Sequence, residues 1–523
     1  MRKQRSGFWY AEYRHLYESI RYASLLFKTV AEVNLTIHTL SDGVNQYVNS
    51  WFLIDQLYRN YLYHVRESGQ LGMMEILSTK VENIYLNKYL LKLNDRWQNL
   101  VDQLEEWKIN GYVKQSNFYK QYILPYVQKE KKVCVIISDA MRYELGEELS
   151  TSIRAEDRLT SVVEPMISSI PSYTQLGMAS LLPNEELLIK DDSYVFVDGR
   201  SSQGTINRDK ILKSAINDKA LALDAKRIAN MKTDDLKILI RDSSVLYIYH
   251  DIIDSIGGDT NSTEMVNAAA KKTIEELTNL TKKLSNCNAR NVIITADHGF
   301  LYQDRKLDES DFIGNRLEGD GILYSDRRMV LGRNLLENSS LKHFTSHQVG
   351  LEGDLEIQIA KSINRLRKRG SGSRFVHGGT SVQEVILPVV LINKKNQKNI
   401  EKVDIDIATG GNNVITSGQL AINFYQKQPL SDNVQKRTLR VGLYTKKGIL
   451  LSEEKELIFD YTSNNPRERE LLERLLLSSK ANDIKKQDVF LRLKEPIEGT
   501  NQLILYKEMV YFMDRQITTD FDF

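Results

Sequence analysis

The sequence is poor in cysteine and proline and contains no long hydrophobic run. Its 523 residues include only two cysteines, Cys134 and Cys287, which excludes a disulfide framework and a cysteine-rich zinc module. No apolar stretch approaches the roughly 20 residues that cross a bilayer, and the N-terminus lacks the apolar core of a signal peptide. We therefore expect a cytoplasmic protein without a membrane segment.

Neither sign of charge predominates. The 71 Lys and Arg residues against 69 Asp and Glu residues give a formal net charge of +2. This balance excludes a surface that is basic overall and coats nucleic acid, but it remains compatible with a local basic patch. With 41% hydrophobic and 27% charged residues, the composition is that of a globular protein. At about 100–200 residues per domain, the length predicts about three domains.

Residues 1–130 are predicted to form a helical domain. The first proline of the chain is Pro125, and apolar residues recur at steps of three and four, as in Met73, Ile76 and Leu77. Tyrosine and tryptophan are frequent in this region. We expect these aromatic side chains to fill the helical core rather than to bind a ligand.

Residues 131–395 are predicted to form an α/β domain. Short, continuous apolar runs are typical of strands buried on both faces of a parallel sheet. Three such runs are 133–138, 244–250 and 291–297. Between the last two, residues 263–284 have the pattern of an amphipathic helix with Thr263 as a candidate N-cap. The strand–helix–strand order indicates βαβ units and an α/β sheet.

Two further patterns complete the chain. The apolar run 384–392 predicts another strand, and its Pro388 favours a position at the edge or end of the sheet. Residues 396–523 alternate apolar and polar residues between Gly, Asn, Asp and Ser turns, which predicts a small antiparallel, sandwich-like β-domain. Within it, the stretch 466–479 is predicted to be helical.

Acidic residues follow the three buried strands. Asp139 follows the first, Asp251 and Asp254 follow the second, and Asp297 with His298 follows the third. Ligands of open α/β sheets bind at the carboxyl ends of the strands. Carboxylates gathered there repel one another unless a cation lies between them, and oxygen with imidazole ligands favours Zn²⁺ or Mn²⁺. Helix capping is the simpler explanation for a single Asp, but it explains the Asp-His-Gly triplet less well, because an imidazole and a glycine that lets backbone approach closely adjoin the acid.

Several hydroxyl groups lie between the first and second strands. They precede the apolar, helix-like stretch of residues 176–182 and are Ser168, Ser169, Ser172 and Thr174. A hydroxyl at a helix N-terminus beside a divalent metal is a candidate nucleophile, because the metal lowers the pKa of the hydroxyl. Ordinary helix capping is the competing explanation for most of the four.

Five motifs in this order resemble one known family. They are SDAMRYE, PSYTQLGMASLLP, YIYHDIID, ITADHGF and RFVHGGTSVQEVILPV. Together they resemble the type A PglZ proteins of BREX phage-defence systems, from about residue 8 to about residue 395. The resemblance implies an alkaline-phosphatase-like core sheet between the helical domain and the β-domain. Because proteins of this family are usually longer, it also implies that a large N-terminal portion is missing here.

The resemblance implies a site for two metals, with Zn²⁺ or Mn²⁺ as the expected ions. One metal would be bound by four residues, namely Asp139, Thr174, Asp297 and His298. Thr174 would be the nucleophile, with Ser169 and Ser172 as alternates. The other metal would be bound by Asp254 and His377.

One ligand of the second metal site is missing. The superfamily pattern Asp-x-x-Gly-His begins at Asp254, but Gly258 stands where the histidine is expected. Three nearby residues are candidates to replace it, namely His250, Asp251 and Asp259. The departure from the pattern puts the second metal in question.

The resemblance therefore implies a metal-dependent phosphoryl-transfer hydrolase that acts in bacteriophage defence on a phosphate ester or diester. Its expected partners are other BREX proteins, and nucleic acid is a further candidate because the superfamily's metal pair also cleaves diesters. The alternative hypothesis is a non-catalytic or weakly catalytic scaffold subunit of a BREX defence complex. In that case the metal site would be retained mainly for structure.

Overall fold

The computed structural model describes residues 12–515, apart from residue 157 and the segments 260–261, 315–320, 369–373, 395–400, 409–412, 432–433 and 497–502. The chain divides into two compact units, Met1–Lys394 and Lys395–Phe523. Among the described residues, no helix is long and apolar enough to cross a membrane.

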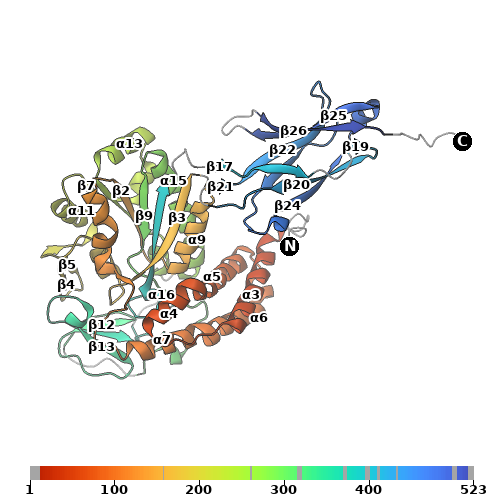
Figure 1. The fold of residues 1–523 in the computed structure, drawn as a ribbon. Helices are drawn as coiled ribbons and strands as arrows, with labels where there is room; N and C mark the ends of the chain where they lie inside the picture. Colours follow the sequence, from red (N-terminus) through yellow and green to blue (C-terminus); the bar gives the residue numbers. More distant parts are fainter. Residues whose placement is uncertain are drawn as a thin grey trace. The chain divides into compact units, whose positions relative to one another are not determined.

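The first unit begins with long helices (Figure 1). They are α3 (Arg14–Glu32), α4 (Leu40–Gln46), α5 (Phe52–Glu67), α6 (Leu71–Ile84) and α7 (Leu91–Val101), with π-helical turns η1 (Tyr47–Trp51) and η2 (Tyr85–Leu90). The helical N-terminal region is therefore confirmed. As expected, its aromatic side chains form the core, since the rings of Tyr58 and Tyr85 are both buried and stack with their centroids 3.7 Å apart.

A seven-stranded sheet follows, in the order β1-β3-β16-β9-β2-β8-β7. The strands are β1 (Val113–Lys114), β2 (Val133–Ser138), β3 (Leu159–Ile167), β7 (Ala220–Asp224), β8 (Val245–His250), β9 (Asn291–Thr295) and β16 (Ile386–Lys394). Strands β9, β2, β8 and β7 are parallel to one another, and β16 is antiparallel to both β9 and β3. Because β2, β8 and β9 are parallel, their carboxyl ends meet at one edge, which confirms the expected α/β core.

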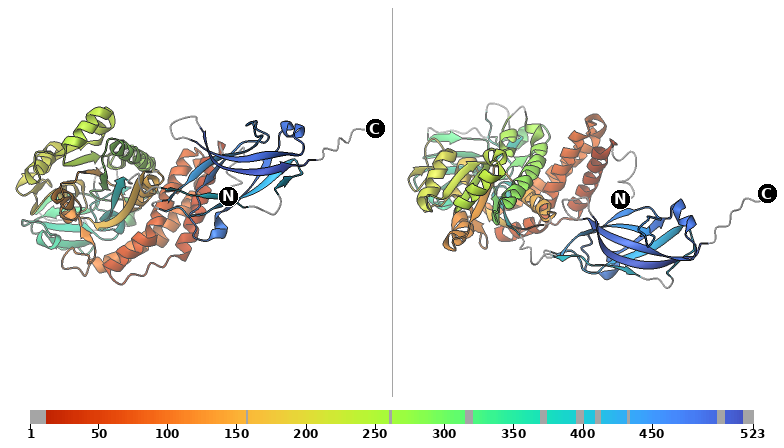
Figure 2. Two further views of the ribbon diagram at one scale, coloured as in Figure 1. Left: turned by 45° about the horizontal axis from the view of Figure 1, so that its top comes forward. Right: turned by 90° about the horizontal axis from the view of Figure 1, so that it is seen from above.

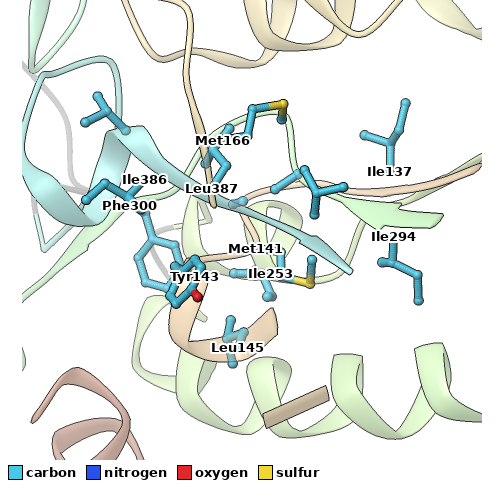
Figure 3. Packing of buried hydrophobic residues seen from close by; sticks show 14 of the residues in the cluster. Ile137, Met141, Tyr143, Leu145, Met166, Ile253, Ile294, Phe300, Ile386 and Leu387 are labelled. Carbon is cyan, nitrogen blue, oxygen red and sulfur yellow. The ribbon is translucent and has the colours of Figure 1, made fainter. Parts of the chain in front are cut away.

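Helices cover both faces of this sheet. On one face, α15 (Val266–Asn286) brings Glu276 to 3.6 Å from His250 of β8, and α9 (Tyr143–Arg154) packs against β3 and β16. The neighbouring residue Tyr249 points to the other face, where Arg208 of α11 (Gly204–Ala215) lies over its ring. Every residue of β2 and β8 is buried, which explains their continuous apolar runs. Figure 3 shows this core, including Ile137, Ile294 and Leu387.

Two local predictions in this unit are wrong. Strand β16 is interior rather than at the edge, because Pro388 lies opposite Pro165 of β3, where neither residue has an N–H to donate, and pairing with β9 begins only at Val389. The helix α15 begins at Val266, and Thr263 does not cap it. The Thr263 hydroxyl instead donates to the carbonyl oxygens of Gly257 and Asp259.

The second unit contains two main β-sheets around one core (Figures 1 and 2). One has the order β18-β20-β24 and the other the order β19-β26-β25-β22-β23. Their bounds are β18 (Ile405–Ala408), β19 (Val414–Ile415), β20 (Gln419–Gln426), β22 (Arg437–Tyr444), β23 (Lys455–Phe459), β24 (Glu470–Leu476), β25 (Gln487–Pro496) and β26 (Leu503–Met513). Side chains of both sheets, such as Phe424 and Phe459, pack together, and the expected antiparallel β-rich C-terminal region is confirmed.

The predicted helix over residues 466–479 is wrong. Only Pro466–Arg469 forms a short 3₁₀ turn, and Glu470–Leu476 forms strand β24. This strand pairs residue by residue with β20 in an antiparallel register. Pairing with a neighbour and burial of Leu475 therefore override the helical preference of the Leu- and Glu-rich sequence.

Candidate metal centre

Two backbone N–H groups of the turn after β2 bind the ends of the neighbouring strands β8 and β9. The Asp139 N–H donates to the carbonyl oxygen of His250 at 2.8 Å. The next residue, Ala140, adopts a left-handed backbone with φ of 57°, and its N–H donates to Oδ1 of Asp297 at 3.1 Å. A left-handed alanine is strained, so this turn persists because both neighbouring strands hold it in place.

The first group of candidate ligands consists of Asp139, Asp297 and His298. Their ligand atoms all lie within 4.8 Å of one another. Oδ1 of Asp139 and Oδ2 of Asp297 are buried without a hydrogen bond and lie 3.4 and 3.5 Å from Nε2 of His298. Burial, reinforced by the nearby carboxylates of Asp297, Asp254 and Asp251, raises the pKa of Asp139 well above its usual range. Two unpartnered carboxylate oxygens facing one imidazole nitrogen fit a divalent cation.

His298 is oriented by its own loop. Its Nδ1 lies 2.9 Å from the carbonyl oxygen of Gly299, which can only accept a hydrogen bond. The proton of a neutral ring therefore lies on Nδ1, and the lone pair of Nε2 is free. The Thr174 hydroxyl lies 3.1 Å from that Nε2. The arrangement presents a basic nitrogen to a hydroxyl and to the carboxylates at the same time.

The second group consists of Asp254, His298 and His377, whose ligand atoms also lie within 4.8 Å of one another. Nε2 of His377 is 3.6 Å from Oδ1 of Asp254, and the rings of His377 and His298 stack with their centroids 4.1 Å apart. Burial and the nearby His298 lower the pKa of His377, which favours the neutral, ligating ring. The two groups share His298 and therefore form one centre.

None of the three residues proposed to replace the missing histidine belongs to either group. His250 faces the other way, since its Nδ1 lies 3.1 Å from the Ser138 hydroxyl and its Nε2 lies toward α15. One carboxylate oxygen of Asp251 accepts the N–H of Ser255, and one of Asp259 accepts the Ser262 hydroxyl. Within the described residues, Asp254, His298 and His377 are thus the whole second group.

Thr174 is the first residue of α10 (Thr174–Ser180) and differs in its contacts from the alternate hydroxyls. Ser172 donates to the carbonyl oxygen of Gly379 at 2.7 Å, and Ser169 bonds to Ser180 at 2.8 Å. Of the three hydroxyls, only Thr174 contacts His298.

Gly177 allows α10 to approach the centre. A Cβ atom at this position would lie 2.2 Å from the carbonyl oxygen of Asp297, so any side chain would push the helix away. A glycine within the apolar LGMAS segment is visible in the sequence, but the sequence alone does not show that it packs against the backbone of Asp297.

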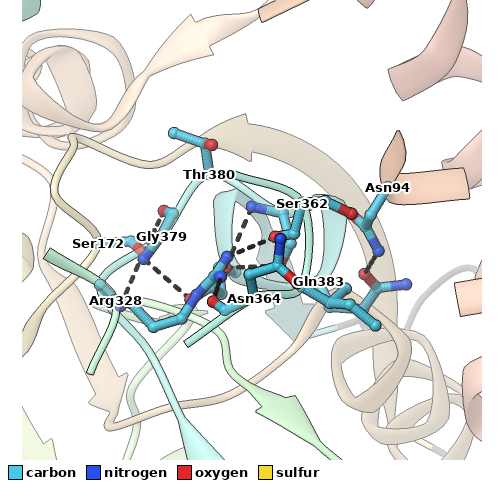
Figure 4. A network of polar contacts seen from close by, with 12 residues as sticks. Asn94, Ser172, Arg328, Ser362, Asn364, Gly379, Thr380 and Gln383 are labelled. Atoms are coloured by element: carbon cyan, nitrogen blue, oxygen red, sulfur yellow. Dashed lines mark hydrogen bonds and ion pairs between the residues drawn. The ribbon is translucent and has the colours of Figure 1, made fainter. Parts of the chain in front are cut away.

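The loop after His377 is held by a buried polar network (Figure 4). The Glu384 carboxylate accepts hydrogen bonds from the Arg328 guanidinium and from the Gly379 N–H. Ser172 accepts the Gly378 N–H, which links this loop to the turn before Thr174. Asn94 of the helical region donates to the Gln383 side chain. Sequence reasoning missed this network because its members are far apart in the chain.

The fold and this cluster define an α/β protein with a candidate metal centre at the carboxyl edge of its sheet. Residues 118–392, more than half of the chain, match the family described as the BREX system PglZ alkaline phosphatase-like domain. The chain belongs to this family, which confirms the resemblance inferred from the five motifs.

Two curated relatives match over nearly the whole chain. One is an alkaline phosphatase-like protein PglZ of Bacillus cereus (strain H3081.97), 30% identical over 98% of this chain and 61% of the relative. The other is an alkaline phosphatase-like protein BrxZ of Escherichia coli O9:H4 (strain HS), 30% identical over 98% of this chain and 60% of the relative. The chain thus spans about three-fifths of the length of these relatives.

Solved structures give distant likenesses. Murine ectonucleotide pyrophosphatase/phosphodiesterase 5 matches with 11% identity and a TM-score of 0.30, over 50% of this chain and 88% of that chain. Phosphonoacetate hydrolase from Sinorhizobium meliloti 1021, in complex with phosphonoacetate, matches with 10% identity and a TM-score of 0.33, over 50% of this chain and 89% of that chain.

Proposed function

We propose that this protein is a metal-dependent phosphoryl-transfer hydrolase, a phosphatase or phosphodiesterase, that acts in BREX phage defence. One observation carries the proposal. The Thr174 hydroxyl lies 3.1 Å from Nε2 of His298, and the same nitrogen faces the unpartnered carboxylate oxygens of Asp139 and Asp297. A hydroxyl beside two unpartnered carboxylate oxygens and an imidazole nitrogen, all of which can bind a metal, fits a nucleophile at a metal centre.

The residues present fit two divalent cations, with Zn²⁺ or Mn²⁺ suited to the oxygen and imidazole donors. One would be held by Asp139, Thr174, Asp297 and His298, and the other by Asp254 and His377. When bound, such ions lower the pKa of a nearby hydroxyl and offset the negative charge of a phosphate.

The proposed reaction has two steps. Oγ of Thr174 attacks phosphorus in line, the Oγ–P bond forms, and the bond from phosphorus to the leaving oxygen breaks. The proton that Oγ loses goes to the leaving oxygen. Water then attacks the phosphorus of the phosphothreonine, the Oγ–P bond breaks to release phosphate or, from a diester, a phosphate monoester, and a proton of that water returns to Oγ. The Nδ1–H of His298 remains bound to the carbonyl oxygen of Gly299 and keeps Nε2 of the ring directed toward Thr174 and the carboxylates.

Hydrolysis of an aryl phosphate and an aryl phosphodiester, measured with added Zn²⁺ or Mn²⁺ and with chelator, tests this function. We expect turnover that chelator removes. Thr174→Ala should lower turnover about 10³-fold with the fold intact, and Thr174→Ser should recover part of it. Unchanged turnover in folded Thr174→Ala would move the nucleophile to a water molecule, because Ser169 and Ser172 are bonded elsewhere.

The alternative is a scaffold subunit of a BREX complex, and the incomplete second group favours it. Residues 131–395 would then be retained for structure, while the helical residues 1–130 and the β-rich residues 396–523 would bind other BREX proteins in the cytoplasm. Phage defence in an Asp297→Ala strain separates the two functions. Intact defence, with no hydrolysis of either ester by the wild-type protein, would establish the scaffold role.

A further inference from the structure

Gln115 connects the helical region to the candidate metal centre. It lies in the short turn η3 (Gln115–Asn117), directly after β1 and three residues before the part of the chain that matches the family. Its side chain is completely buried. A buried amide requires partners for both its oxygen and its nitrogen, so its contacts define what it holds together.

The Gln115 side chain bridges the two segments that meet at the centre. Its Nε2 donates to the carbonyl oxygen of Asp297 at 2.6 Å and lies 3.2 Å from that of Ala296. Its Oε1 accepts the N–H of Ser169 at 3.0 Å and lies 3.4 Å from the Ser168 hydroxyl. The carbonyl oxygens can only accept and the Ser169 N–H can only donate, so the amide has one orientation.

The same Asp297 carbonyl is approached from α10, where Gly177 leaves room for it. We propose that Gln115 is a positioning residue that fixes the separation between Asp297 and Thr174, an inference that rests on the proposed function. The amide sets how closely the Ser168–Thr174 turn approaches the end of β9. Gly177 then determines how closely α10 can follow.

Trp107 provides a matched control. Its Nε1 donates to the carbonyl oxygen of Ser168 at 2.8 Å, so it is a buried residue that holds the same turn without contacting Asp297. Gln115→Met keeps a side chain of similar size and removes all its hydrogen bonds. Gln115→Glu keeps the acceptor for Ser169 and, when ionised, lacks the donor for Asp297.

The experiment uses the full chain and measures Co²⁺ affinity, the visible absorption spectrum of bound Co²⁺, and the kcat and KM of aryl ester hydrolysis. For Gln115→Met we expect at least tenfold weaker Co²⁺ binding, a changed spectrum, and a fall in kcat of about 100-fold with KM within about threefold. Trp107→Phe should change the Co²⁺ affinity, kcat and KM by less than threefold and should leave the spectrum unchanged.

Equal Co²⁺ affinity and equal spectra in folded Gln115→Met and Trp107→Phe would overturn the inference. If Gln115→Met does not fold, the same comparison is made with Gln115→Glu. Lack of hydrolysis by the wild-type protein would overturn the proposed function instead, and the Co²⁺ measurements would still decide the role of Gln115.

An independent feature lies in the helical region, a groove of about 420 Å³ between the end of α3 and the continuous helix formed by η2 and α7. Its floor is apolar and includes Phe27, Val30, Leu35 and Ile84, and its rim carries Lys88, Lys92 and Arg96. The three cations follow at four-residue steps on one helix face and are exposed. Within the described chain none of them forms an ion pair, and no described residue that lines the groove is acidic.

We infer that this groove binds an acidic amphipathic helix of a partner protein. Glutamates at four-residue steps on such a helix would match the spacing of the cations, about 6 Å per step, while its apolar side chains would fill the floor. Nucleic acid fits less well, because stacking of bases needs open aromatic faces and Phe27 has Lys80 over its ring at 5.5 Å.

The test is the fluorescence anisotropy of a labelled 20-residue helical peptide with Leu on one face and Glu flanking it, added to the full chain. A Lys88→Glu, Lys92→Glu, Arg96→Glu variant should bind it at least tenfold more weakly. The matched control replaces three exposed lysines of the second unit by glutamate, namely Lys446, Lys447 and Lys485, and should bind the peptide as the wild type does. Equal affinity in the two variants, or no binding, would overturn the inference. Tighter binding of a 20-nucleotide poly-dT strand, lost only in the groove variant, would assign the groove to nucleic acid and also overturn it.

Discussion

The two ligand groups of the centre share His298 but differ in how they are held. In the first group, the side chains of Asp139 and Asp297 are 8% and 0% exposed. In the second, the side chains of His377 and Asp254 are 22% and 26% exposed. The difference follows from the fold, because the first group lies at the ends of two paired strands, while the second lies on a short helix, α14 (Ile253–Gly257), and on a loop.

In this centre, the more buried ligand group also has the more complete set of candidate metal ligands. The first group has two unpartnered carboxylate oxygens, an oriented imidazole and a hydroxyl within reach. The second has one carboxylate, one further imidazole and Gly258 where the superfamily pattern has a histidine. We therefore expect tight metal binding by the first group and weak binding by the second, because each lost ligand weakens a metal site.

The largest effect should come from breaking the first group. Asp297→Asn keeps the size of the side chain and can still accept the Ala140 N–H, but it removes a negative charge from the centre. We expect metal affinity to fall at least 100-fold and aryl ester turnover about 10³-fold, measured by calorimetric titration with Mn²⁺ and by steady-state kinetics. Asp251→Asn, an exposed acid outside both groups, is the control and should change affinity less than threefold. Equal losses in both variants would show that charge in the region, not ligation, explains the binding.

A smaller effect should come from completing the second group. Gly258→His supplies the missing imidazole at a position whose φ of −73° accepts any residue. A Cβ atom there would be 3.1 Å from the Asp254 carbonyl oxygen, so the backbone must shift by a few tenths of an ångström. We expect about tenfold tighter binding of a second Zn²⁺, measured as stoichiometry and affinity in a titration of the metal-free protein. Gly258→Asn, which adds a polar side chain that is a poor zinc ligand, is the control. A second site equally strong in wild type and Gly258→His would mean that the second group is already complete.

The sequence predicted the parts of the centre that are local in the chain. Asp139, Asp254 and Asp297 were found because each follows an apolar run, and parallel strands bring such positions to one edge. The β-alternation beyond residue 396 was equally readable, because period-two burial leaves its pattern in the sequence. Thr174 could not be separated from Ser169 and Ser172 by residue type, since all three are hydroxyls in one turn.

The features that could not be predicted from the sequence depend on contacts between segments that are far apart in the chain. Gln115 carries no motif, and its role follows only from a turn that lies 182 positions before Asp297 in the chain and contacts it in the fold. Pro388 favoured an edge strand, but Pro165 lies opposite it and makes an interior position possible. The Leu- and Glu-rich stretch before Leu476 matched a helix until β20 provided a pairing partner.

The smallest predicted effect concerns the pH dependence of the stability of the helical region, which is independent of the candidate metal centre. Burial lowers the pKa of His64 to about 4, with nearby His15, Arg14 and Lys271 lowering it further and Glu18 opposing them. Since the unfolded value is about 6.5, the unfolded state binds more protons between these pH values, and stability falls as pH drops from about 6.5 towards 4. The loss is at most about 3 kcal/mol.

His64→Phe should remove most of this dependence of the free energy of unfolding on pH. The measurement is the urea midpoint at each pH, followed by tryptophan fluorescence, which reports on the first unit because all four tryptophans lie there. His38→Gln, at an exposed histidine of the same region, should keep the slope, and both variants should bind Mn²⁺ at pH 7 as the wild type does. An unchanged slope in His64→Phe would mean that titratable groups other than His64 cause the acid sensitivity. The buried Asp139 is not one of them, because a carboxyl whose pKa is raised by folding stabilises the folded state as pH falls.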